Sequence, residues 1–180
     1  MRLLAIPLAL TLALTLAACN PAPQIAPVSL EVSDVAFSPA QAAFIKKPGV
    51  AVINGEAFLR ENSGGLKHAS GEVVRLIPQS DYARSRFAKL YGGEKFVSAR
   101  DIPKVPADPA YVDYTRTTKV DERGHFTFDH VPPGRYFIST QVLWRNDKSF
   151  FTEGGAIYDS VTISAKDTED APVKVIVSGK

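Results

Sequence analysis

Residues 120–136 read Val-Asp-Glu-Arg-Gly-His-Phe-Thr-Phe-Asp-His-Val-Pro-Pro-Gly-Arg-Tyr, and this stretch decides the fold. Phe126 and Phe128 are separated by one residue, so on a strand both project to the same face. Turn residues stand on both sides, because residues 121–124 suit a hairpin turn and residues 133–134 supply a second turn. The stretch therefore predicts a strand between two tight turns, with both phenylalanines facing a core.

The strand that follows the second turn also has a core-facing side. Tyr136, Ile138 and Val142 share this side, and Trp144 falls on the same parity. We expect the Trp144 ring to close one end of the core, provided that its indole nitrogen finds a hydrogen-bond acceptor.

Further strands are predicted on both sides of this segment. Residues 51–60 alternate apolar and polar side chains, apart from Val52 and Phe58, and a turn cluster at residues 62–65 separates them from a second strand predicted at residues 72–77. These two strands are expected to pair or to be neighbours. Two closing strands are predicted from apolar residues that share one side of each strand: Ile157, Val161, Ile163, Val173, Val175 and Val177. The total of about seven short strands predicts an all-β sandwich.

One segment has a helical pattern instead. Ser80 can cap its first turn, and glycines at positions 92 and 93 end it. Its apolar residues share one face: Ala83, Phe87, Leu90 and Tyr91. From there to Pro109, several prolines and little periodicity predict a long surface loop. We expect one short helix against the sandwich, within an excursion at about residues 80–114 for which a variable insertion is the favoured interpretation.

The stretch at residues 120–136 resembles the carboxypeptidase regulatory-like domain. The matching residues are Asp121, Gly124, Phe126, Phe128, Pro133, Gly134 and Tyr136, with support from Gly71, Val74, Leu76 and Pro78. The resemblance extends over residues 50–179. It implies a prealbumin-like (transthyretin-like) Greek-key β-sandwich of about seven strands, and it implies no peptidase activity.

The N-terminal residues indicate export. Arg2 precedes an apolar stretch at residues 3–16, and the small residues Ala17 and Ala18 precede Cys19. The sequence Leu-Ala-Ala-Cys that ends this segment resembles the lipobox of bacterial lipoproteins. That resemblance implies a diacylglyceryl thioether on Cys19, cleavage between Ala18 and Cys19, and N-acylation. The alternative is an ordinary secretory signal with an incidental cysteine.

These features divide the chain into three parts. We expect a signal peptide at residues 1–18, a lipidated cysteine with a flexible, proline-containing tether at residues 19–35, and the sandwich domain at residues 36–180. In lipoproteins of two-membrane bacteria, an aspartate after the cysteine commonly causes retention at the inner membrane, and Asn20 departs from that pattern. The expected location is the cell envelope, at the outer membrane and facing the periplasm.

No catalytic motif stands out, and the sequence implies no metal and no cofactor. His68, His125 and His130 lack the tight spacing of metal ligands, and His125 should face away from the core because it adjoins Phe126. Neither a nucleophile elbow, nor a zinc-protease helix, nor a phosphate-binding loop is present. A net charge of +2, without a run of like charges, gives nucleic-acid binding little support.

Several aromatic residues are candidates for contact with a partner. Phe150 and Phe151 follow a polar turn and, as strand neighbours, cannot both face one core. Tyr111 and Tyr114 join them as candidate contacts for a sugar, a peptide or an envelope protein. The predicted function is a non-catalytic, lipid-anchored envelope protein whose sandwich serves binding or structural interaction. The alternatives are an envelope hydrolase or a small-ligand carrier with a loop-assembled site.

Overall fold

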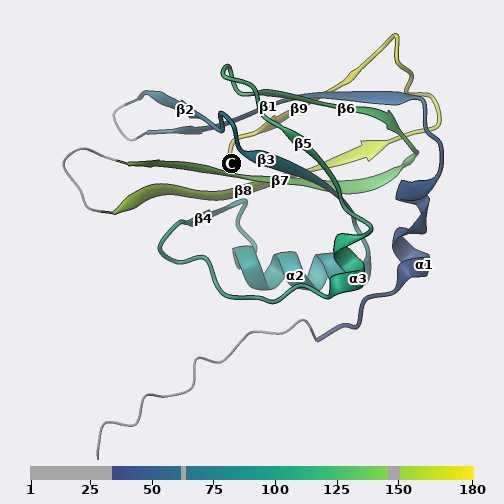
Figure 1. Cartoon of the computed structure of the whole chain (residues 1–180), viewed down its shortest axis with the longest axis horizontal. Helices are drawn as coiled ribbons and strands as arrows, with labels where there is room; N and C mark the ends of the chain where they lie inside the picture. The colour runs from purple at the N-terminus through teal and green to yellow at the C-terminus, as the bar shows by residue number, and fades with distance from the viewer. Residues whose placement is uncertain (1–33, 62–63, 146–150) are drawn as a thin grey trace, which may run out of the picture.

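The computed structural model describes residues 34–61, 64–145 and 151–180. In these residues nine strands form two sheets that stack as a sandwich, and α2 and α3 lie beside the outer face of one sheet (Figure 1). The all-β prediction is therefore confirmed. The predicted signal peptide and nearly all of the predicted tether, Ala18 and Cys19 included, lie outside the described residues. No helix in the described ranges combines the length and the apolar composition needed to cross a membrane.

The first sheet is built around β1 (Ala51–Arg60). This strand pairs antiparallel with β6 (His125–Val131) and with β2 (Leu66–His68). It pairs in parallel with β9 (Val173–Val177). A short helix, α1 (Pro39–Ala42), and a 3-10 turn at residues 43–46 precede it.

The second sheet has the strand order β4-β8-β7-β3-β5, and all of its pairs are antiparallel. Its central strand is the long β7, which is hydrogen-bonded to β8 and to β3. The strands are β4 (Phe96–Ser98), β8 (Thr152–Ile163), β7 (Gly134–Arg145), β3 (Val73–Pro78) and β5 (Arg116–Lys119).

The main core lies between the two sheets and contains the side chains that the sequence assigned to it. Phe126 and Phe128 are buried, as are Tyr136 and Ile138. The Tyr136 hydroxyl donates a hydrogen bond to the Pro132 carbonyl at 2.8 Å, so this buried phenol is satisfied. The apolar parity of β7, β8 and β9 is likewise confirmed by their contributions to this core.

The Trp144 ring is partly buried against the main core. Its indole Nε1 donates to Glu153 Oε2 at 3.1 Å, across the pair formed by β7 and β8. The expected acceptor for the indole is therefore present.

Two predicted pairings are wrong. Strands β1 and β3 lie in different sheets, and the turn at residues 121–124 joins β5 to β6 across the sandwich instead of forming a hairpin. The turn itself forms: Asp121 Oδ1 accepts the N–H groups of Arg123 and His125 at 2.8 Å each, and Gly124 has a φ of +91°. Alternation shows which side of a strand faces the core. It does not show whether the next strand along the chain pairs with it in the same sheet or packs against it from the other sheet.

The helix predicted after residue 80 is confirmed as α2 (Asp81–Tyr91). Ser80 Oγ accepts the Ala83 N–H at 3.1 Å, and Gly92, with a φ of +60°, ends the helix in the left-handed region. Its apolar face packs on the outer face of the five-stranded sheet, where it forms a second, smaller core with Phe137.

The remainder of the excursion is more regular than a surface loop. It contains β4, which adds a strand to the edge of β8, and α3 (Pro109–Val112), which is capped by the Asp108 side chain. Elements of three and four residues are too short to show a period in the sequence. The segment thus forms a third layer over one sheet, and the nine strands exceed the predicted seven partly because of β4.

Candidate functional site

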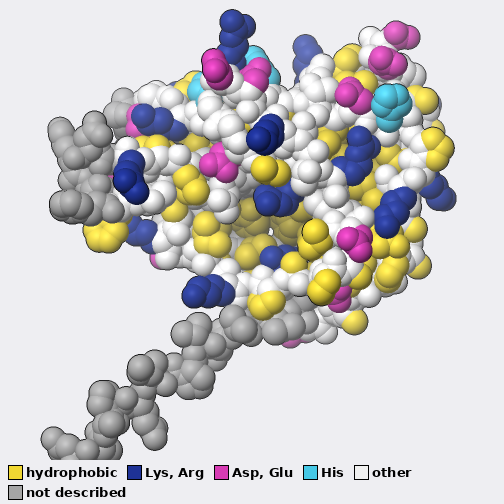
Figure 2. Space-filling model, in the orientation of Figure 1, with side chains coloured by type: hydrophobic (Ala, Val, Ile, Leu, Met, Phe, Trp, Pro, Cys, Tyr) yellow, Lys and Arg dark blue, Asp and Glu magenta, His cyan; other side chains and the backbone are white. Residues whose placement is uncertain are grey.

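A cavity of about 670 Å³ lies between the five-stranded sheet and the layer that carries α2 and α3. This volume is within the range of small-molecule sites, roughly 300–1,000 Å³. Figure 2 shows a hollow between the sheet and the helices, with hydrophobic side chains inside it and Lys or Arg side chains around it. The cavity is therefore open to solvent on the face that the figure presents.

The floor of the cavity is a row of polar side chains across three strands. Arg75 of β3 pairs directly with Thr117 of β5 on one side and with Ser139 of β7 on the other. Because Val74 and Leu76 are fully buried in the main core, Arg75 between them faces the opposite side of the sheet. All three members of the row line the cavity, together with Gln141 further along β7.

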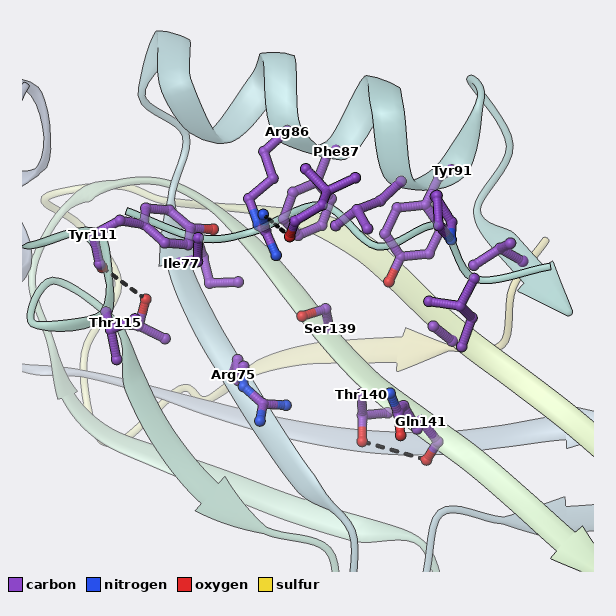
Figure 3. A pocket seen from close by; sticks show the side chains of 18 of the residues that line it. Arg75, Ile77, Arg86, Phe87, Tyr91, Tyr111, Thr115, Ser139, Thr140 and Gln141 are labelled. Carbon is purple, nitrogen blue, oxygen red and sulfur yellow. Dashed lines mark hydrogen bonds between the residues drawn. The ribbon is translucent and has the colours of Figure 1, made fainter. Parts of the chain in front are cut away.

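Aromatic and aliphatic side chains of α2 form one wall. Phe87 and Tyr91 stack with ring centroids 5.4 Å apart, and both are buried. Leu90 and Ile77 extend this apolar surface. Figure 3 shows Arg86, Phe87 and Tyr91 on the helix side of the space, with Arg75, Ser139 and Gln141 on the sheet side.

The segment at residues 102–107 covers part of the cavity and is held in place by α2. Arg86 Nη1 donates to the carbonyl oxygens of Val105 at 2.5 Å and Pro106 at 2.7 Å. The Tyr82 hydroxyl accepts the N–H of Asp108 at 2.7 Å, just before α3. Arg86 thus positions the cover and also brings a positive charge to the cavity lining.

Tyr111 is the most unusual group in the lining. Its side chain is 7% exposed, and its hydroxyl is buried without a hydrogen-bond partner among the described residues. Burial raises the pKa of this phenol, so it stays neutral and can both donate and accept. An unsatisfied buried polar group costs about 1–3 kcal/mol, so a partner supplied by a ligand would offset that cost.

The structure disperses the residues that the sequence marked as partner contacts. Tyr111 is in the cavity wall, whereas Tyr114 is partly buried beneath Lys46, whose Nζ lies 3.8 Å from its ring centroid. Phe151 is 61% exposed at the start of β8 and faces the guanidinium of Arg100. Phe150 lies outside the described residues. A contact at Phe151 therefore stays a prediction, and Tyr111 contributes to a cavity and not to an open surface.

The histidines are separate from the cavity. His68 is on β2, His125 begins β6 and is exposed, and His130 is the penultimate residue of β6. The outward orientation expected for His125 is confirmed. In residues 34–61, 64–145 and 151–180, no three side chains of His, Cys, Asp or Glu gather closely enough to hold a metal ion.

Sequence reasoning missed Arg75, Ser139 and Arg86 as cavity residues. A usable signal was nevertheless present, because Ile77 and Phe137 are apolar at positions where β3 and β7 face away from the main core. Apolar residues on that face indicate a covering layer. The polar residues two positions away, Arg75 and Ser139, then mark the part of the face that the layer leaves open.

Comparison with known proteins identifies a solved structure that is similar to this chain. No family model and no curated protein matches this sequence. The crystal structure of a Pseudomonas aeruginosa protein with a suggested role in carbohydrate binding, determined at 2.61 Å, is similar with a TM-score of 0.66 and 30% sequence identity. The similarity covers 79% of this chain and 97% of the Pseudomonas chain, so it includes essentially the whole of that structure.

Proposed function

We propose that this chain, which belongs to the same family as the Pseudomonas aeruginosa protein, binds a carbohydrate without catalysing a reaction on it. The site is the cavity between α2 and the five-stranded sheet. The observation that carries the proposal is the buried Tyr111 hydroxyl, which lacks a partner in the described residues and lies in the wall of that cavity. The suggested role of the Pseudomonas protein supports the same class of ligand.

The lining matches the two kinds of surface that a sugar ring presents. The C–H groups of a sugar ring form apolar patches that pack against apolar surface, and the parts of Phe87, Leu90 and Tyr91 that line the cavity provide such a surface. The hydroxyl groups of the sugar need donors and acceptors, which Arg75, Ser139 and Gln141 supply from the floor. A purely apolar ligand would leave these polar groups without partners, so the lining favours a saccharide.

The proposal includes the location inferred from the N-terminus. Acylation of Cys19 would tether the domain to the outer membrane, and the tether at residues 19–35 would let it face the periplasm. Within the sandwich, the resemblance of residues 120–136 to the carboxypeptidase regulatory-like domain agrees with a binding or structural module. An envelope glycan is then the expected partner.

Binding should be tested with the purified protein against an array of neutral and acidic oligosaccharides, followed by titration calorimetry on the hits. Tyr111→Phe keeps the ring and removes only the hydroxyl, so affinity should fall by about tenfold. Tyr158→Phe is the matched control, because Tyr158 packs on Phe87 but does not line the cavity. Failure to bind any oligosaccharide would overturn the function, and an unchanged affinity for Tyr111→Phe would overturn the site.

A further inference from the structure

The cavity lining carries positive charge. Arg75 is on the floor, Arg86 is on the helix side, and Lys104 belongs to the cover. The described residues of the lining include no aspartate and no glutamate. The Arg75 side chain forms no hydrogen bond or ion pair with any described residue, so its guanidinium is available to a ligand.

The surroundings of Arg75 fit a planar or tetrahedral anion. Thr117 and Ser139 are its direct cross-strand neighbours, and such neighbours have Cβ atoms roughly 4.5–5.5 Å apart. A guanidinium can donate two parallel hydrogen bonds to the oxygens of one acidic group. The two flanking hydroxyls provide further donors to the same group, and neither is engaged with another described residue.

The positive field extends from the floor to the aromatic wall. Burial raises the pKa of Tyr111, whereas the positive charges of Arg86 and Arg75 act to lower that pKa. The same two arginines also act to lower the pKa of Tyr91. Both phenols therefore experience the arginine charges, and an anion between them and the floor would be stabilised.

We propose that the ligand is an acidic saccharide, a sugar bearing a carboxylate or a sulfate ester, whose acidic group binds Arg75 between the hydroxyls of Thr117 and Ser139. This inference rests on the proposed function and narrows it to one charge class. A neutral sugar would fill the same space but would leave Arg75 without a counter-charge.

The test compares each acid with its own neutral ester. Uronate trisaccharides of gluco, galacto and manno configuration, their methyl esters, and a sulfated neutral trisaccharide with its unsulfated parent are titrated into the purified protein. At least one uronate should bind about tenfold more tightly than its ester, or the sulfated trisaccharide about tenfold more tightly than its unsulfated parent, with an affinity that falls as salt is added. Preference for a uronate or for the sulfated sugar identifies the acidic group.

The outcomes separate the inference from the proposed function. Equal affinity for every uronate and its ester, together with no tighter binding of the sulfated trisaccharide than of its unsulfated parent, would overturn the acidic class and leave carbohydrate binding intact. If none of these sugars bound while neutral sugars on the array did bind, the acidic class would also be overturned and carbohydrate binding would stand. Failure of every sugar would overturn both.

A pair of variants tests the position of the acidic group. Arg75→Gln should weaken binding of the acid by about tenfold and change binding of the ester less than about twofold. Arg135→Gln is the matched control, because it removes the same charge from a strand of the same sheet outside the cavity lining. Equal effects of Arg75→Gln on acid and ester, or no effect on either, would contradict the assignment. Urea unfolding of both variants confirms that they are folded.

Discussion

Phe87 of α2 and Phe137 of β7 stack with ring centroids 4.2 Å apart and an interplanar angle of 15°. The edge of Tyr158 meets Phe87 at a centroid distance of 4.9 Å, so the stack is enclosed by a third ring. This contact fixes the helix on the outer face of the sheet. Because one wall of the cavity belongs to α2, the shape of the binding site depends on this second core.

Phe87→Ala should lower the free energy of unfolding by about 3 kcal/mol, because it removes a buried ring and leaves a void. It should also weaken oligosaccharide binding, since the aromatic wall is lost. Urea denaturation and calorimetry measure the two effects. Phe151→Ala, at a position 61% exposed, should cost less than about 1 kcal/mol. Equal costs for the two substitutions would contradict the second core.

Phe128→Ala should destabilise the sandwich by about 3–5 kcal/mol. The ring is 2% exposed and meets Phe126 edge-on at a centroid distance of 6.0 Å, between the two sheets. Ile176→Ala, on the exposed side of β9, serves as the control and should change stability by about 0.5 kcal/mol or less. Comparison of urea midpoints provides the measurement, and a small loss for Phe128→Ala would contradict its place in the main core.

Asp121 makes stability depend on pH in the acid range. Its pKa is lowered mainly by the hydrogen bond from the backbone N–H of His125, with a further contribution from that of Arg123. A carboxyl whose pKa is lower when folded stabilises the protein above its unfolded pKa of about 4, and this stabilisation is lost as the pH falls toward the folded value. Urea midpoints between pH 5 and pH 2.5 should therefore decline less steeply in Asp121→Asn. Parallel curves for both proteins would contradict this role.

Lipid attachment at Cys19 predicts incorporation of labelled palmitate into the wild-type protein in a bacterial host. Cys19→Ser should abolish the label and release an unprocessed or soluble form, because the acyl chains hold the protein at the membrane. Asn20→Asp, which should keep the label and shift retention toward the inner membrane, is an informative companion. Label retained by Cys19→Ser would exclude this cysteine as the attachment site.

The sequence predicts the two-sheet core well because its alternation is strong. Phe126, Ile138 and Val161 belong to strands in which most residues of one face are apolar, and such strands need a core on that side. Pairing is predicted less well. The strands at residues 51–60 and 73–78 follow one another with a turn cluster between them, as in a hairpin, yet they lie in different sheets.

The cavity could be predicted only in part. Tyr111 was recognised as a candidate contact, but its burial depends on the fold of α3 against α2, for which residues 109–112 give no periodic signal. Arg75 and Ser139 lie 64 positions apart and meet through the register of β3 and β7. Register follows from the whole sheet, so no local pattern could place these two side chains together.

The parallel pairing of β9 with β1 joins segments that are far apart in the sequence. Ile53 in the first strand pairs with Val173, 120 positions further along. Contacts between such distant residues slow folding, because a long loop must be ordered before they form. A polypeptide shortened before Val173 would leave the backbone groups along one edge of β1 without their partners, and unpaired edges of this kind recruit strands from other molecules and promote aggregation.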